Sequence, residues 1–183
     1  MKRTTRSRQD STKEMTELAQ RACLIAKDSA FNVRDYIENS SNIAYVAVKQ
    51  CERELDDIER EIDEGLPAAI TEVTEAEARQ LLACLKFIID LERIGDLLWS
   101  GAQHIQDLSS ALPKEDVRVL LEMTGILLRM LEHIYKDSSL SMKNPRRPCY
   151  RRIPISTRRV MLFSGGICRA FLVSATATVS RFS

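Results

Sequence analysis

The chain has 183 residues, of which 44% are hydrophobic, 5% aromatic and 29% charged, with a net charge of +1. This hydrophobic content permits a real core and excludes a disordered chain, and the few aromatic, Gly and Pro residues argue against an all-β sandwich. No run of 18 or more uncharged apolar residues occurs, so a transmembrane helix is not expected. Residues 1–12 are basic but precede no apolar segment with a cleavage site, so a secretory signal is not expected either.

The chain has five cysteines, an odd number, and none of them belongs to a CxxC pair. They are Cys23, Cys51, Cys84, Cys149 and Cys168. Such spacing argues against both a disulfide framework and a zinc site. Reduced, mostly buried thiols in a cytosolic protein are the expected state.

The charge is unevenly distributed along the chain. Residues 143–183 carry nine Lys and Arg side chains and no Asp or Glu, which leaves 18 basic and 26 acidic side chains in residues 1–142. These are two different compositions, and they predict two different kinds of structure.

The acidic part predicts helices in chain order. After a disordered arm over 1–10, an apolar stripe indicates a first helix from about residue 11, and the polar residues 39–42 end it. A second helix is expected over 43–70, with a kink or a stop at Gly65 and Pro67. The stripe positions of these two helices are Met15, Leu18, Ala22, Ile25, Ser29 and Val33, then Cys51, Leu55, Ile58, Ile62 and Leu66.

Thr74 and Glu77 match a capping box, which predicts a third helix from there to about residue 106. Pro113 suits the first turn of a fourth helix over 113–140. Short connections predict an antiparallel three-helix bundle over 11–108. The fourth stripe needs a cover from this bundle, a second bundle or a partner, and self-association is expected if none covers it. Its members are Val117, Leu120, Leu121, Thr124, Leu128, Leu131 and Tyr135.

The basic segment 141–183 is expected to be irregular and poorly ordered, because Pro145, Pro148 and Pro154 exclude a helix across its first part. Arginine clusters bind phosphates, so an alternative function is the binding of nucleic acid or an anionic membrane through this tail. Its aromatic residues are too scattered for a base-stacking platform, and nucleic acid is not the expected partner.

The second helix carries one row of acids, Glu52, Asp56, Glu59 and Asp63, which fall within about 60° of each other on a helical wheel. The row is either one half of a metal site or a solvated flank with pairs such as Asp56 to Arg60.

On the third helix, Glu92 and Asp96 lie one turn apart, and the wheel places them in the middle of an apolar face made of Leu81, Leu85, Ile88 and Trp99. Unpaired buried carboxylates are costly, so they need a cation, a hydrogen-bond network or protonation. A metal bridging the two helices is one solution, and a buried Arg21 or Arg34 from the first helix is the other.

A faint internal repeat joins the first and fourth helices. Met15, Thr16 and Arg21 recur at an offset of 108 residues as Met123, Thr124 and Arg129. The fourth helix therefore opens a candidate second copy of the bundle.

One run resembles the signature DLERIGD of the PhoU family of phosphate-transport regulators: Asp90-Leu91-Glu92-Arg93-Ile94-Gly95-Asp96. Residues 55–62 are also similar to that family, and the resemblance covers about 14–108 well and 113–140 plausibly.

This resemblance implies an all-helical protein of two tandem three-helix bundles that bind metal ions through E/DxxxD motifs, with iron, zinc, manganese or magnesium as the metal. It implies a cytoplasmic, often dimeric protein, peripheral to the membrane, that represses phosphate uptake and starvation signalling when phosphate is plentiful. The implied partners are the ATPase of the phosphate ABC transporter and a phosphate-sensing histidine kinase. The matching motifs are Glu52 to Asp56, Glu59 to Asp63 and Glu92 to Asp96.

The chain departs from the family after about residue 140, where two more helices and a second E/DxxxD set are expected. We expect the second repeat to be truncated, with a frame shift or truncation near Ser141, and a non-functional truncated member is a further alternative. An enzyme is not expected, since no nucleophile or phosphate-loop motif occurs. A di-metal carboxylate enzyme would need Glu-x-x-His motifs, but Gly101 and Met130 precede His104 and His133 at that spacing.

Overall fold

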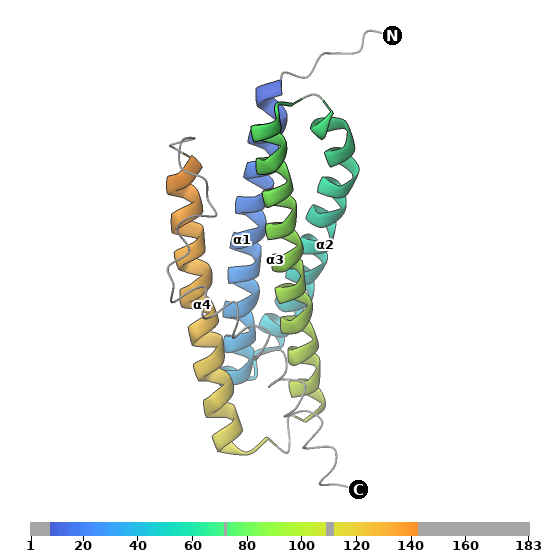
Figure 1. The fold of residues 1–183 in the computed structure, drawn as a ribbon. Helices are drawn as coiled ribbons and strands as arrows, with labels where there is room; N and C mark the ends of the chain where they lie inside the picture. The colour runs from blue at the N-terminus through green and yellow to red at the C-terminus, as the bar shows by residue number, and fades with distance from the viewer. Residues whose placement is uncertain (1–7, 72, 109–111, 143–183) are drawn as a thin grey trace, which may run out of the picture. The chain divides into compact units, whose positions relative to one another are not determined.

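The computed structural model describes residues 8–71, 73–108 and 112–142, with side chains described over 13–71, 73–108 and 112–136. These residues form four helices, α1 (Arg8–Asn39), α2 (Asn42–Ile70), α3 (Glu75–Asp107) and α4 (Lys114–Met142), as Figure 1 shows. Within the described ranges there is no strand, so the predicted all-α class is confirmed. The predicted tail, from residue 143 on, lies outside the described residues, as do residues 1–7 of the predicted arm.

The turn between α1 and α2 lies where the sequence predicts it. Ser40 adopts a left-handed φ of 53° and its N–H donates to the carbonyl of Tyr36, which ends α1. Ser41 then caps α2, because its hydroxyl accepts a hydrogen bond from the N–H of Ala44 at 3.2 Å. At the other end of α1 the prediction was short: the helix begins at Arg8, inside the expected arm.

The range of 43–70 predicted for the second helix is confirmed, and the stop considered at Gly65 and Pro67 does not occur, because α2 continues to Ile70. Proline removes one backbone donor, and this close to the helix end few hydrogen bonds remain to be lost. The alanines after Pro67 favour the helix, and Ala69 is buried in the core. The hydroxyl of Thr71 donates to the carbonyl of Ala68 at 2.9 Å and satisfies one terminal acceptor.

The capping box before α3 is confirmed. The hydroxyl of Thr74 accepts from the N–H of Glu77 at 3.4 Å, and the Glu77 carboxylate accepts from the N–H of Thr74 at 2.9 Å. Before α4, the carbonyl of Pro113 accepts from the N–H of Val117 at 3.2 Å, so Pro113 precedes the first turn. Glu115 and Asp116 then lie in that turn, where acids favour a helix N-terminus.

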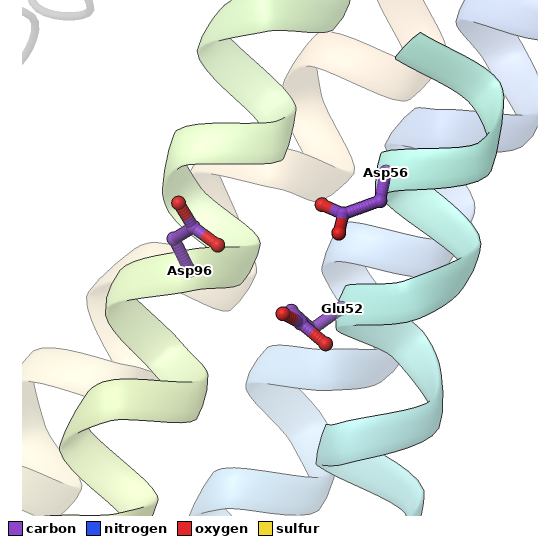
Figure 2. A group of neighbouring side chains, drawn as sticks. All are labelled: Glu52, Asp56 and Asp96. Carbon is purple, nitrogen blue, oxygen red and sulfur yellow. The ribbon is translucent and has the colours of Figure 1, made fainter. Parts of the chain in front are cut away.

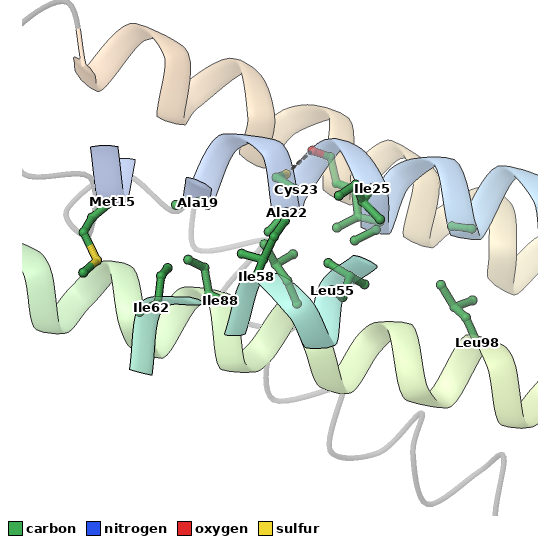
Figure 3. Close-up of a cluster of buried hydrophobic side chains, with 14 of the residues drawn as sticks. Met15, Ala19, Ala22, Cys23, Ile25, Leu55, Ile58, Ile62, Ile88 and Leu98 are labelled. Carbon is green, nitrogen blue, oxygen red and sulfur yellow. Dashed lines mark hydrogen bonds between the residues drawn. The ribbon is translucent and has the colours of Figure 1, made fainter. Parts of the chain in front are cut away.

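Helix α1 is the centre of the packing, since it contacts α2, α3 and α4, while α2 also contacts α3. Small residues allow this close approach on several sides: Ala22, Ala26 and Ala30 are fully buried on α1. The core fills with aliphatic side chains of α2 and α3, among them Leu55, Ile58, Ile62, Leu81, Ile88 and Leu91 (Figure 3). The three-helix bundle expected for α1, α2 and α3 is therefore present.

Helix α4 lies antiparallel to α1 (Figure 1) and is partly covered by it. The Cys23 thiol donates to the carbonyl of Leu131 at 3.7 Å, a contact drawn in Figure 3, and both residues are buried. These two residues are 108 apart, which is the offset of the internal repeat, so repeat-related positions meet between α1 and α4. Val119 and Ile126, which lie outside the predicted stripe, are exposed, and self-association through α4 stays a prediction.

The hydropathy and length of the helices bear on whether they could cross a membrane. None of the helices in the described residues is long and apolar enough to cross a membrane.

Candidate metal centre

The site lies beside a close contact between α2 and α3. Gly95 of α3 is buried, and a methyl group placed on it would lie 2.5 Å from Leu55 Cδ1 and 3.9 Å from the Cα of Glu52. Any side chain at residue 95 would therefore push against α2. The glycine in the LERIGD run brings the two helix backbones together at this level.

Three carboxylates converge beside this contact. Glu52 and Asp56 come from α2 and Asp96 from α3, with one oxygen of each within 4.8 Å of the others, and Figure 2 shows them pointing into the same space. Glu52 and Asp56 are half-buried, whereas Asp96 is exposed. Among the described side chains, no Lys or Arg lies within 4.0 Å of these three.

The pKa values of two glutamates at this site are raised, that of Glu52 in the cluster and that of Glu92 beside it. The pKa of Glu92 rises to about 7, first because of burial and then because of the Asp96 charge, a hydrogen bond with Asp96, and the charges of Glu59 and Asp56. The pKa of Glu52 is also raised, by burial and by Asp56 and Asp96, against the opposing charges of Arg53 and Lys49. Both shifts reflect burial first and the charges of neighbouring carboxylates second.

The remaining predicted acids extend the site along α2. Glu59 and Asp63 line an open cleft together with Asp56 and Glu92, and Arg60 and Glu64 lie at its side. Of the six predicted residues, the structure thus brings Glu52, Asp56 and Asp96 into one cluster. It places Glu92, Glu59 and Asp63 beside that cluster rather than in it.

Three details of the sequence analysis were wrong. Glu92 and Asp96 lie at the margin of the buried face of α3, which is made of Leu81, Ile88, Leu91, Gly95, Leu98, Ala102 and Ile105. The arginine alternatives do not reach them, since Arg21 is exposed and Arg34 pairs with Glu38 at 3.8 Å. Arg60 pairs with Asp57 at 3.0 Å and not with Asp56, which leaves Asp56 to the cluster.

Sequence reasoning missed Lys49 and the role of Trp99. The ammonium group of Lys49 lies 5.6 Å from the centre of the Trp99 ring, a cation–π distance. Tyr45 contacts the same ring at 5.1 Å between centroids. The spacing in the sequence could have indicated both residues. Lys49 precedes Glu52 by three residues and Trp99 follows Asp96 by three, which places each of them next to the acid on its own helix.

The donor chemistry of the cluster fits a hard cation. Carboxylate oxygens suit Mg²⁺, Mn²⁺ and iron ions, whereas structural zinc sites are built mainly from Cys and His. Two of the three ligand side chains are half-buried and carry charge that no neighbouring basic group pairs within the described residues. A cation there would offset the repulsion that raises the pKa values of Glu52 and Glu92.

Comparison with known proteins gives one family. Searches of curated proteins and of solved structures found no significant match. The PhoU domain matches residues 9–105, a range that includes most of α1 and α3, all of α2 and all six predicted site residues. The match covers more than half of the chain, and the chain belongs to the PhoU family.

Proposed function

We propose that the chain is a non-catalytic regulator of phosphate homeostasis that represses phosphate uptake and phosphate-starvation signalling through protein contacts. The observation that carries this proposal is the family match over 9–105, which spans the α1–α3 bundle almost completely. The chemistry of the site agrees with it, because carboxylates that face one another between two helices can hold a cation.

The proposed role of the cation is structural. Glu52 and Asp56 would hold it from α2 and Asp96 from α3, so that the ion joins the two helices. The adjoining surface is lined by Glu92, Glu59 and Asp63, whose carboxylates would offset or position further positive charge. Magnesium, manganese and iron fit this oxygen-only set better than zinc does.

The proposed partners are the ATPase of a phosphate ABC transporter and a phosphate-sensing histidine kinase, met at the cytoplasmic face of the membrane. A homo-oligomer is part of the proposal, because exposed apolar residues such as Val119 and Ile126 remain on α4.

A pull-down with the transporter ATPase from the same source tests the proposal at high phosphate. An unrelated ABC-transporter ATPase serves as the specificity control, and a PhoU protein with two complete bundles serves as the positive control. We expect specific retention of the phosphate-transporter ATPase by the full chain. If the two-bundle protein retains it and this chain does not, the chain keeps the fold of the family without its regulatory contact.

A further inference from the structure

Lys49 and Trp99 form the next layer of the α2–α3 pair beyond the carboxylate cluster. Lys49 lies three residues before Glu52 on α2, and Trp99 lies three residues after Asp96 on α3. In an antiparallel pair, these two steps lead to the same end of the site. The ammonium of Lys49 lies 5.6 Å from the Trp99 ring centre, so the two side chains meet across the helices.

Trp99, the aromatic member of this layer, belongs to a stack of three rings. Tyr45 contacts Trp99 at 5.1 Å between ring centroids, and Tyr36 contacts Tyr45 at 5.2 Å, so the stack runs from α3 through α2 to α1. Trp99 therefore offers a fixed ring face, which holds the end of an otherwise mobile lysine near the cluster. Lys49 is one helical turn from Glu52 and contacts the ring of Trp99, one turn from Asp96, so its charge lies on the side of the cluster where the two helices meet. Arg53, next to Glu52 in the sequence, is a second cation whose charge acts on Glu52.

We propose that Lys49, seated on Trp99, is the internal counter-charge of the Glu52, Asp56 and Asp96 cluster and sets its affinity for a divalent cation. This inference rests on the proposed function of that cluster. When the site holds no ion, the ammonium offsets part of the carboxylate repulsion. When a divalent ion binds, the same ammonium repels it, so Lys49 lowers the affinity and raises the ion concentration at which the site fills.

The test compares Mn²⁺ binding to the full chain and three variants by electron paramagnetic resonance of the free ion. Lys49→Met removes the charge and keeps an apolar stem against Trp99, and Lys49→Arg keeps the charge. Lys86→Met is the matched control, since Lys86 is an exposed lysine of α3 that affects the pKa of neither Glu52 nor Glu92.

At low salt we expect Lys49→Met to bind Mn²⁺ about threefold to tenfold more tightly than the wild type, as one charge near a divalent ion in a solvated site implies. Lys49→Arg and Lys86→Met should bind like the wild type, and 0.5 M salt should shrink the gain because salt screens exposed charges. In EDTA, Lys49→Met should melt at a lower temperature than Lys86→Met, because the carboxylates lose their counter-charge.

Two results separate the inference from the function on which it rests. If the wild type binds Mn²⁺ through Glu52 and Asp96 while Lys49→Met binds equally or less tightly, the role of Lys49 is wrong and the metal site stands. If the wild type does not bind Mn²⁺, or if the double variant Glu52→Gln and Asp96→Asn binds it as well as the wild type does, the metal site is wrong. The role of Lys49 in metal affinity is then overturned with it.

Discussion

Leu55 of α2 packs directly over Gly95 of α3, so closely that a methyl group on residue 95 would lie 2.5 Å from Leu55 Cδ1. Leu55 is 1% exposed and belongs to the hydrophobic core, so a change in its position would disturb its packing. Two acids of the cluster, Glu52 and Asp96, lie next to this contact. The same packing contact therefore closes the core and brings the acids of two helices together.

Gly95→Ala tests this relation. Alanine favours a helix by about 1 kcal/mol over glycine, but forcing a methyl group into a packed core costs about 1–3 kcal/mol. We expect a net loss of about 1 kcal/mol in the free energy of unfolding, measured by urea denaturation, and weaker Mn²⁺ binding as α2 and α3 are pushed apart.

Gly65→Ala is the matched control for this substitution. Its added methyl group would lie 3.6 Å from Met15 Cε, which is ordinary contact. This variant should gain about 0.5–1 kcal/mol of stability. Equal gains from both substitutions would show that Gly95 is not needed for the close approach.

The raised pKa of Glu92 predicts a pH dependence of stability. The folded-state pKa is about 7 against an ordinary value of 4.5, so the folded protein binds more protons than the unfolded chain between these values. The contribution of Glu92 to stability is present below pH 4.5 and is lost as the pH rises through 7. In EDTA, the free energy of unfolding should fall by about 1 kcal/mol between pH 5 and 8, after allowance for solvent screening.

Glu92→Gln should flatten this pH profile, because the amide does not titrate. Glu61→Gln, an exposed position on α2, should leave the slope unchanged. A slope that survives in Glu92→Gln would assign the pH dependence to other groups.

The capping box of α3 predicts a local effect. Thr74→Ala removes the acceptor for the N–H of Glu77 and should cost about 1 kcal/mol of stability. Thr74→Ser keeps the oxygen and should retain most of it. Neither variant should change Mn²⁺ affinity, because Thr74 lies at the start of α3, about six helical turns before the Asp96 level. A marked loss of affinity would mean that this end of the helix supports the site.

The contact between α1 and α4 predicts the reactivity of Cys23. Its thiol is fully buried against the Leu131 carbonyl, and burial raises its pKa to about 11. Only the thiolate reacts rapidly with alkylating agents, so Cys23 should be protected in the native state and should react after unfolding. Peptide mapping by mass spectrometry resolves Cys23 from the other cysteines, and rapid native labelling would contradict the packing of α4 on α1.

Much of the fold could be predicted from local signals. The break at Ser40, the capping box at Thr74 and the turn before α4 follow from residues that compete for backbone hydrogen bonds, and these signals act within a few residues. The predicted range of α2 also agrees with the structure, but the continuation of α2 past Gly65 and Pro67 could not be derived in this way, because the burial of Ala69 depends on tertiary packing.

Only part of the site could be predicted from the sequence, because the rest also depends on tertiary packing. Periodicity places the acids of α2 in one row and pairs Glu92 with Asp96, but it cannot say which of them meet across helices. That depends on how α3 packs against α1 and α2, which buries Leu91, Gly95 and Leu98 of α3. Glu92 and Asp96 then lie at the edge, where Asp96 reaches Glu52 and Asp56.

The measurement that tests the account most directly is Mn²⁺ binding to the purified, metal-stripped chain, compared with Glu52→Gln combined with Asp96→Asn. Glu61→Gln combined with Asp90→Asn is the control, since it removes one exposed acid from each of the same two helices. We predict that the wild type and the control bind Mn²⁺ and are stabilised against heat by it, and that the first double variant does neither. Equal binding and equal stabilisation in all three proteins would contradict a metal centre between α2 and α3.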